Sequence, residues 1–282
     1  MVTSENTCVR VWNLETQSLV HRFADFDDFA KIAISADTKV LICYLVGVNI
    51  MRAYSLETCE IIKESRLERD ENTGIIDREK ILLISATTYG EQLLVAYQDD
   101  SQAITQNYKS GAVVYTLKCA EESSRITALA VSKEYFACGY QFKYLKQEMP
   151  YAVDIFATGG GAYVRTLRGC NEDNITHLMI NSMGSHALCA STSEATWSSD
   201  LAVWNLETEE HKHLASHAGV AHVAAVESLT YFVTSCKGEH TLRVWNLSGA
   251  IIKPAMKVGT DTGLRYNYQE KLNIFSTGPI LN

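Results

Sequence analysis

"VWNLET" at residues 11–16 returns letter for letter at 203–208, and its first four residues, "VWNL", return at 244–247. A phrase that recurs within one chain indicates a repeat, and the period of that repeat predicts the fold. Each copy ends an apolar, β-prone stretch with polar residues that are typical of a turn. The same pattern, in weaker form, is therefore expected between the copies.

Six aromatic residues occupy the position of the tryptophan in this phrase. They are Trp12, Tyr54, Tyr108, Phe156, Trp204 and Trp245. The spacings between them run from 41 to 54 residues. This period is typical of four-stranded propeller blades, the longer intervals being blades with extended loops.

The intervals between the aromatic residues also predict strands. After Trp204 come four short apolar or alternating runs, at 210–216, 220–226, 230–236 and 241–247, separated by polar residues. The interval after Trp12 has the same rhythm, with "SLVHRF" at 18–23 as its first run. No segment combines helical periodicity with helix caps. The sequence therefore predicts an all-β chain of four-stranded antiparallel sheets.

Residues 216–246 resemble one unit of the WD-repeat family of β-propellers, and the resemblance extends over almost the whole chain. The family pattern there is a Gly-His-like loop, a strand ending in Thr-Ser, an acidic turn and a tryptophan. The resemblance implies a structural hydrogen-bond chain inside the blade. Its matching positions here are His217, Ser235, Glu239 and Trp245. A buried indole N–H needs an acceptor, and such a chain supplies one.

Both ends of the sequence fall within a repeat. The first residues supply the end of one strand and the strand that carries Trp12, while 250–277 contains three further predicted strands with no aromatic anchor after them. Residues 1–282 are therefore expected to form one propeller with about six blades visible. An open alternative is that they are part of a larger or tandem propeller.

Composition narrows the class of function. The net charge is −8 and no dense run of Lys and Arg appears, so nucleic acid is not an expected partner. The eight cysteines form no Cys-x-x-Cys pair, which favours reduced thiols over a zinc site. No signal peptide and no apolar stretch of about 18 residues are present. We expect a cytoplasmic protein with no membrane contact.

The motifs do not predict catalysis. "GGGAY" at 159–163 follows Phe156 at the place of a hairpin turn, and no Lys follows it as in a phosphate-binding loop. His211 and His213 share one face of an expected edge strand, but no third ligand completes a zinc spacing. No nucleophile elbow of the Gly-x-Ser-x-Gly type occurs. We predict no enzyme activity, no cofactor and no metal.

The long loops are predicted to share one face. In a four-stranded blade with strands a, b, c and d, the d-to-a and b-to-c connections lie at one end and the other turns at the opposite end. Residues 64–80 join d to a, whereas 140–150 and 191–200 join b to c. Long loops on a rigid scaffold commonly carry recognition, and aromatic residues commonly anchor it. The candidate partner-binding residues are Phe142, Lys143, Tyr144 and Trp197.

The preferred function is a non-enzymatic scaffold that binds a protein or peptide partner through this face. The alternative is a regulatory, autoinhibitory propeller of a larger NACHT-type nucleotide-switch protein, since WD-repeat rings follow a NACHT domain in one family. No Gly-x-x-x-x-Gly-Lys motif is present in this chain, so the ATPase of such a switch would lie elsewhere. A catalytic propeller is a third class. The sequence names neither the partner nor the oligomeric state.

Overall fold

The structure is a computed structural model, and it describes most of the first 257 residues. The described ranges are 2–5, 8–13, 18–23, 30–35, 39–45, 50–66, 81–86, 92–97, 101–119, 124–142, 151–168, 175–181, 183–192, 198–218, 220–225, 229–236, 241–248 and 250–257. Within these ranges the regular structure is β-strand, and no helix has the length and apolar character to cross a membrane.

The strands form six antiparallel sheets in chain order, here called sheets 1 to 6. Sheet 1 contains β1 (Val2–Glu5), β2 (Cys8–Asn13) and β3 (Ser18–Phe23). Sheet 2 contains β4 (Ala30–Ile34), β5 (Val40–Leu45), β6 (Ile50–Ser55) and β7 (Ile61–Arg66). Sheet 3 contains β8 (Ile81–Ala86), β9 (Gln92–Tyr97), β10 (Gln102–Asn107) and β11 (Val113–Lys118).

The second half of the chain repeats this order. Sheet 4 contains β12 (Ser124–Val131), β13 (Tyr135–Phe142), β14 (Tyr151–Ala157) and β15 (Tyr163–Arg168). Sheet 5 contains β16 (Ile175–Ile180), β17 (His186–Thr192), β18 (Ser198–Asn205) and β19 (His211–Ala218). Sheet 6 contains β20 (Val220–Ala225), β21 (Tyr231–Cys236), β22 (Thr241–Asn246) and β23 (Ile251–Lys257).

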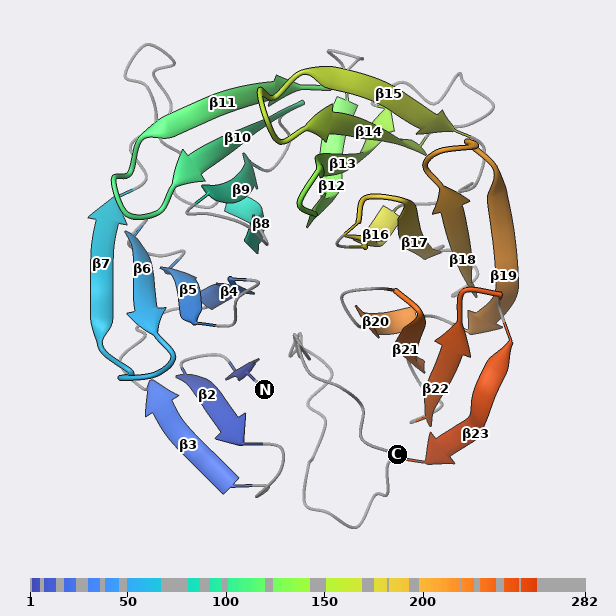
Figure 1. The fold of residues 1–282 in the computed structure, drawn as a ribbon. Coiled ribbons are helices and arrows are strands. Elements are labelled where there is room, and N and C mark those ends of the chain that lie inside the picture. Colours follow the sequence, from blue (N-terminus) through green and yellow to red (C-terminus); the bar gives the residue numbers. More distant parts are fainter. Residues whose placement is uncertain are drawn as a thin grey trace.

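The sheets stand radially, as the blades of a β-propeller do. Figure 1 shows β4, β8, β12, β16 and β20 on the inside and β3, β7, β11, β15, β19 and β23 on the perimeter. Each strand pairs with the next along the chain, so the order from inside to outside is a, b, c, d. The prediction of an all-β propeller of four-stranded antiparallel blades is confirmed, and sheet 1 shows three strands among the described residues.

The hydrophobic core lies in the seams between neighbouring sheets. One cluster joins sheets 4 and 5, for example, and contains Val153, Leu167, Leu178 and Trp204. Four further clusters occupy the seams from sheets 1 and 2 to sheets 5 and 6. Strands buried on both sides need apolar residues in runs rather than in strict alternation, and β5 is buried at every position, "VLICYL".

The repeated phrase is a c-to-d hairpin, and one anchor differs from the prediction. In several sheets the backbone N–H of the residue after the anchor donates a hydrogen bond to a backbone carbonyl on the other side of the turn. These donors are Ser55, Asn107, Ala157 and Asn205. Asn107 is therefore the equivalent of Asn205, which makes Gln106 the equivalent of Trp204. The expected anchor Tyr108 lies two residues further on, in the turn, where it is buried against sheet 2.

Candidate functional site

The predicted partner-binding residues lie at the edge of the described part of the chain. Phe142 is the last residue of β13, and its side chain is not described. Lys143, Tyr144 and Trp197 lie outside the described residues. Their roles therefore stay predictions. The structure describes the strand ends beside them.

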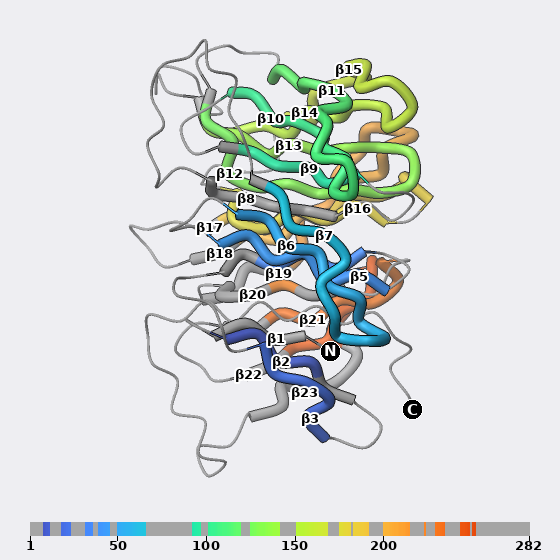
Figure 2. The backbone as a smooth tube through the Cα atoms, turned by 90° about the vertical axis from the view of Figure 1, so that its left-hand side faces the viewer, coloured from blue at the N-terminus to red at the C-terminus, as the bar shows by residue number. Residues whose placement is uncertain are grey.

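The strand topology places the long connections on one face. Residues 67–80 connect β7 to β8, 143–150 connect β13 to β14, and 193–197 connect β17 to β18. These are d-to-a and b-to-c connections, so they leave the same end of the sheets, here called the loop face. The opposite end, the turn face, holds the a-to-b and c-to-d turns. The c-to-d hairpins gather on one side of the molecule in Figure 2.

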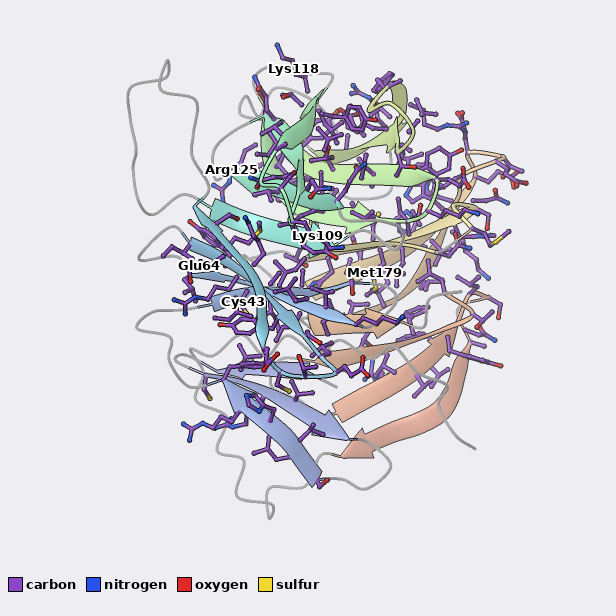
Figure 3. All side chains as sticks on the ribbon, turned by 60° about the vertical axis from the view of Figure 1, so that its left-hand side comes forward. Cys43, Glu64, Lys109, Lys118, Arg125 and Met179 are labelled. Carbon is purple, nitrogen blue, oxygen red and sulfur yellow. The ribbon has the colours of Figure 1, made fainter. Side chains whose placement is uncertain are left out.

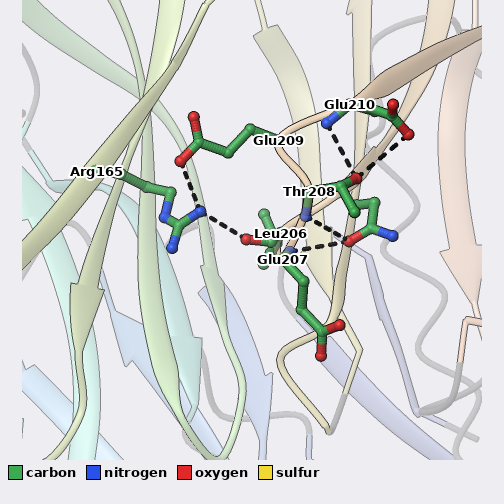
Figure 4. Close-up of polar contacts among 7 residues, drawn as sticks. Arg165, Leu206, Glu207, Thr208, Glu209 and Glu210 are labelled. Atoms are coloured by element: carbon green, nitrogen blue, oxygen red, sulfur yellow. Dashed lines mark hydrogen bonds and ion pairs between the residues drawn. The ribbon is translucent and has the colours of Figure 1, made fainter.

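The turn face is tied together by its own contacts. In sheet 5 the N–H of Leu206, in a c-to-d turn, donates to the carbonyl of Ser185, in the a-to-b turn, at 2.8 Å. Between sheets, Arg165 of β15 donates to the carbonyl of Leu206 at 2.7 Å and pairs with Glu209 at 2.8 Å (Figure 4). Lys212 of β19 likewise donates to the carbonyl of Ser248 in the next sheet. The c-to-d turns of sheets 5 and 6 are thus held by the preceding sheet.

At the loop face, sheet 4 presents a polar row to sheet 5. In the strand register, Arg125 lies opposite Gln141 on the neighbouring strand, and Gln141 lies opposite Tyr151 on the next. The three side chains therefore lie on the same side of the sheet. Tyr151 packs against the cluster shared with sheet 5, which shows the side that they face. The Gln141 amide donates to the Tyr151 hydroxyl at 3.2 Å. Arg125 belongs to this end of the sheets and Lys109 to the other; both are labelled in Figure 3.

On sheet 5, the polar residues Ser191 and Asp200 lie on the side that faces sheet 4. These residues pair across β17 and β18, and Ser191 also pairs with Ile175. Their neighbours Cys189 and Ala202 belong to the cluster shared with sheet 4, so strand alternation turns Ser191 and Asp200 toward sheet 4. Ser191 is 1% exposed, and its Oγ has no hydrogen-bond partner among the described residues.

No sequence motif marks these polar residues. Arg125, Gln141, Tyr151, Ser191 and Asp200 carry no motif, and their nearness depends on which side of each strand faces the neighbouring sheet. A signal was nevertheless present. Each lies close to the end of an expected strand on the loop face, and strand alternation would have assigned its side once the strand boundaries were known.

The structural hydrogen-bond chain shows a different acceptor. The buried indole of Trp245 donates to Thr234 Oγ1 at 2.9 Å, one residue before the expected Ser235. Phe232 pairs with Trp245, and alternation places Thr234 on the side of Phe232 and Ser235 on the other. The side chains of His217, in β19, and Ser235, in β21, are not described, and Glu239 lies outside the described residues. The remainder of the chain stays a prediction.

A second buried polar chain lies in sheet 4. Asp154 is fully buried and accepts hydrogen bonds from Tyr140 at 3.2 Å and from Thr166 at 2.5 Å. Burial, and next the nearby Asp154 carboxylate, raise the pKa of Tyr140 well above the ordinary phenol value of 10.0. Tyr163 contacts Thr166 at 2.8 Å. These groups hold β13, β14 and β15 together, which is a structural role.

No metal-binding group is evident in the part of the chain that the structure describes. No set of three or more His, Cys, Asp or Glu side chains is gathered there as a metal site would require. His211 and His213 lie at the outer edge, as expected, with the His211 ring 4.5 Å from the ring of Trp204. None of the six described cysteines forms a disulfide bond, and five of them are buried.

Comparisons with known proteins agree on the fold. No family model matches the chain, and no curated protein matches it. Two solved structures are similar along most of their length. The Cps50 (Swd1) β-propeller domain of Myceliophteria thermophila has 13% identity and a TM-score of 0.66, and the match covers 89% of this chain and 80% of that one. These blades are propeller blades.

The second solved structure shows that proteins with a similar fold can differ in activity. Hydrazine synthase of Kuenenia stuttgartiensis has 11% identity and a TM-score of 0.65, with 86% of this chain and 71% of that one covered. By its name that protein is an enzyme, whereas the first structure is named only as a propeller domain. Identities this low show a shared fold alone, because propellers of unrelated function share the same sheets.

Proposed function

We propose that this chain is a non-enzymatic scaffold that binds a protein or peptide partner through its loop face. One observation carries the proposal: the two longest connections between strands, 67–80 and 143–150, leave the loop face, whereas several turns of the opposite face are engaged in contacts within the propeller. A face with extended connections on a rigid scaffold can vary in sequence without loss of the fold, which suits recognition. Phe142, Lys143, Tyr144 and Trp197 are the proposed contact residues.

The setting of the scaffold is part of the proposal. It acts in the cytoplasm, without nucleic acid or membrane as a partner, and the charge of −8 together with the absence of a basic run supports this setting. It needs no cofactor. The WD-repeat relationship belongs here too, supported by the repeated "VWN" phrase and by the propeller fold.

The second candidate is a regulatory propeller of a NACHT-type nucleotide switch. The degenerate repeats favour it, above all sheet 3, where Gln106 takes the place of the aromatic anchor. It predicts an upstream coding sequence with a Gly-x-x-x-x-Gly-Lys-Ser/Thr motif in the same reading frame. A genomic reading frame without such a motif would remove this candidate.

The test of the scaffold is an affinity purification with matched variants. The loop-face variant carries Phe142→Ala, Tyr144→Ala and Trp197→Ala. The control variant carries Tyr163→Ala, Tyr231→Ala and Ile251→Ala, three exposed residues beside the turn face. All proteins are compared at equal expression and with melting temperatures matched to the wild type.

We expect partners that the wild type and the control variant recover, and that the loop-face variant loses. Identical partner lists for all three proteins would contradict the placement of the interface. Partners lost only from the control variant would assign the interface to the turn face instead.

A further inference from the structure

The outer strand β11 has an edge without the usual protection against a further strand. Each outer strand ends its sheet, so within the described residues its outer side pairs with no strand. Charged side chains and proline in an edge strand discourage the addition of another chain. The described outer strands other than β11 share such a residue among their first five positions, namely Arg22, Lys63, Arg165, Lys212 and Pro254. The first five residues of β11, "VVYTL" at 113–117, are all uncharged.

The backbone of β11 directs donors and acceptors outward. The N–H of Tyr115 donates to Thr105 Oγ1 at 3.0 Å, and the N–H of Cys119 donates to the carbonyl of the residue before β10 at 3.0 Å. Both bonds point toward β10. Successive residues of an antiparallel strand turn their N–H and C=O groups to opposite neighbours. The N–H and C=O groups of Thr116 and Lys118 therefore point away from β10, to the perimeter where Figure 1 shows β11.

The side chains of β11 suit a strand at this edge. Val113 is 54% exposed and Val114 is 38% exposed, and Thr116 is exposed as well. Valine, tyrosine and threonine have high β-propensity, because they pack well on a half-buried pleated surface. An added strand would cover the two valines and pair with the outward backbone groups. These are the contributions that β-strand addition uses in peptide recognition.

Two lysines make the outer part of this seam positive, although the whole chain carries a charge of −8. Thr116 lies opposite Ile104, which packs against the cluster shared with sheet 2, so Lys118 lies on that side too. On β7, Lys63 lies opposite Ala53 of the same cluster and therefore faces sheet 3. Both lysines are exposed.

The acidic residue of β7 does not offset these lysines. Glu64 lies on the opposite side of sheet 2, where its carboxylate accepts from Arg52 at 2.6 Å. An acidic residue of a strand bound beside β11 is therefore attracted by Lys118 and Lys63. Its uncharged residues fit beside the two exposed valines.

An extended segment of another protein is the occupant that matches these features. A second copy of the chain would bring the same net charge of −8, and one pair of edge strands buries far less than the about 1,200 Å² of a stable interface. A nucleic acid would offer phosphates to the lysines but no apolar group of matching shape to the valines.

We propose that the outer edge of β11 binds an extended segment of a protein partner as a fifth strand of sheet 3. The centre of the segment is uncharged and β-prone and lies beside Val113 and Val114, and an acidic residue lies beside Lys118 and Lys63. The backbone groups of Thr116 and Lys118 exchange hydrogen bonds with the segment. This surface is on the perimeter and is separate from the loop face.

The experiment uses a random 12-residue peptide library displayed on phage. The library is selected on the wild-type chain and depleted on Thr116→Pro, which removes an outward N–H that the ladder with β10 does not use. If Thr116→Pro melts at a lower temperature, Thr116→Lys replaces it, because a charge in the middle of an edge strand also blocks pairing. The selected peptides are synthesised, and their dissociation constants are measured by fluorescence polarisation.

We expect peptides with four or more uncharged β-prone residues in a row and an Asp or Glu beside them. The edge-blocking variant should weaken their binding about tenfold or more, and Lys118→Ala about threefold. Val113→Ser should weaken binding about threefold or more, whereas Ile251→Ser, the matched exchange at the equivalent exposed position of β23, should leave it unchanged. The loop-face triple variant should bind like the wild type.

Two measurements on the wild-type chain test the strand pairing itself. In the complex, the amides of Thr116 and Lys118 should exchange with deuterium about tenfold more slowly than in the free chain, as followed by NMR. The same peptide with N-methyl groups on alternate backbone nitrogens of one edge should lose its binding, while methylation of the other edge is tolerated.

Other outcomes would overturn the proposal. A library without binders, a consensus rich in proline or in basic residues, equal affinity for the wild type and the edge-blocking variant, or amides that stay unprotected would each do so. A wild-type dimer in light scattering that the edge-blocking variant abolishes would make a second copy the occupant. Peptides that lose affinity only for the loop-face triple variant would support the proposed function and remove the β11 edge as a binding surface.

Discussion

At the residue scale, four side chains of the "VWNLET" phrase at 203–208 have a physical role in the hairpin, namely Trp204, Asn205, Leu206 and Thr208. Trp204 is buried in the seam with sheet 4, and Leu206 packs beside it. Asn205 Oδ1 accepts from the N–H groups of Glu207 and Thr208, which closes the turn. Thr208 Oγ1 then accepts from the N–H of Glu210. The phrase recurs because its tryptophan packs against the neighbouring sheet and its asparagine closes the hairpin turn to the outer strand.

The Trp245–Thr234 bond is testable by exchanging a hydroxyl for a methyl group. Thr234→Val keeps the shape but leaves the buried indole N–H without this acceptor, so unfolding should become easier by about 1–3 kcal/mol. Urea denaturation measures the change. In a Trp245→Phe background the same exchange should cost clearly less, and an equal cost in both backgrounds would show that the bond contributes nothing.

The buried thiol of Cys43 predicts a pH dependence. Burial raises its pKa above the ordinary thiol value of 9.0, so the folded state keeps a proton that the unfolded chain releases. Stability from this group is complete below pH 9 and falls at higher pH, by about 1.4 kcal/mol per pH unit. Between pH 8 and 10.5 the wild type should lose about 2 kcal/mol more than Cys43→Ala in urea denaturation. Parallel losses would contradict this assignment.

At the element scale, the c-to-d hairpins share a left-handed residue before the outer strand. Cys59, Gly111, Gly161 and Glu209 take this place with positive φ. Glycine adopts that conformation without strain, whereas Cys59 and Glu209 are strained there. The glycine-rich turn 159–161 is thus part of a hairpin, as predicted.

Substitutions at two neighbouring glycines of this turn distinguish the effect of backbone strain from the effect of replacing a glycine as such. Gly161 has a φ of 66°, and an added Cβ would lie 3.0 Å from Tyr115; Gly160 has open space around it. Gly161→Ala should lower the free energy of unfolding by about 1–2 kcal/mol or more, whereas Gly160→Ala should leave it almost unchanged. Thermal melts of the two variants measure the difference. Equal melting temperatures would show that the turn relaxes without cost.

At the scale of the whole molecule, the stability of each blade is expected to depend on its contacts with the neighbouring blades. The clusters of the described residues lie in seams between successive sheets, so each of sheets 2 to 5 depends on its two neighbours. The loop face occupies one end of the propeller and the turn face the other. A partner bound across the loop face would therefore touch several blades at once.

Removing the wedge of one seam should loosen the two sheets that it joins. Trp204→Ala leaves a cavity between sheets 4 and 5 and should cost about 3–5 kcal/mol. Hydrogen exchange should then accelerate in β12–β19 before it does in β4–β7. His211→Ala, which removes the exposed ring beside Trp204, is the control and should change neither region. Uniform acceleration across all sheets would contradict seam-by-seam stability.

Local pattern determined the strands of this protein and the turns that join them, and the period of 41 to 54 residues between the aromatic anchors predicted the radial β-propeller. Apolar runs of strand length and Asn- or Gly-containing turns act over a few residues, so "SLVHRF" at 18–23 corresponds to β3 without any knowledge of the fold. Tertiary structure alone decided that Gln106, not Tyr108, occupies the anchor position, that Thr234 accepts from Trp245, and that Ser191 and Asp200 lie on the side of sheet 5 that meets sheet 4. Those outcomes depend on the register and on the side of each strand that meets the next sheet, and a shift of one residue reverses the side.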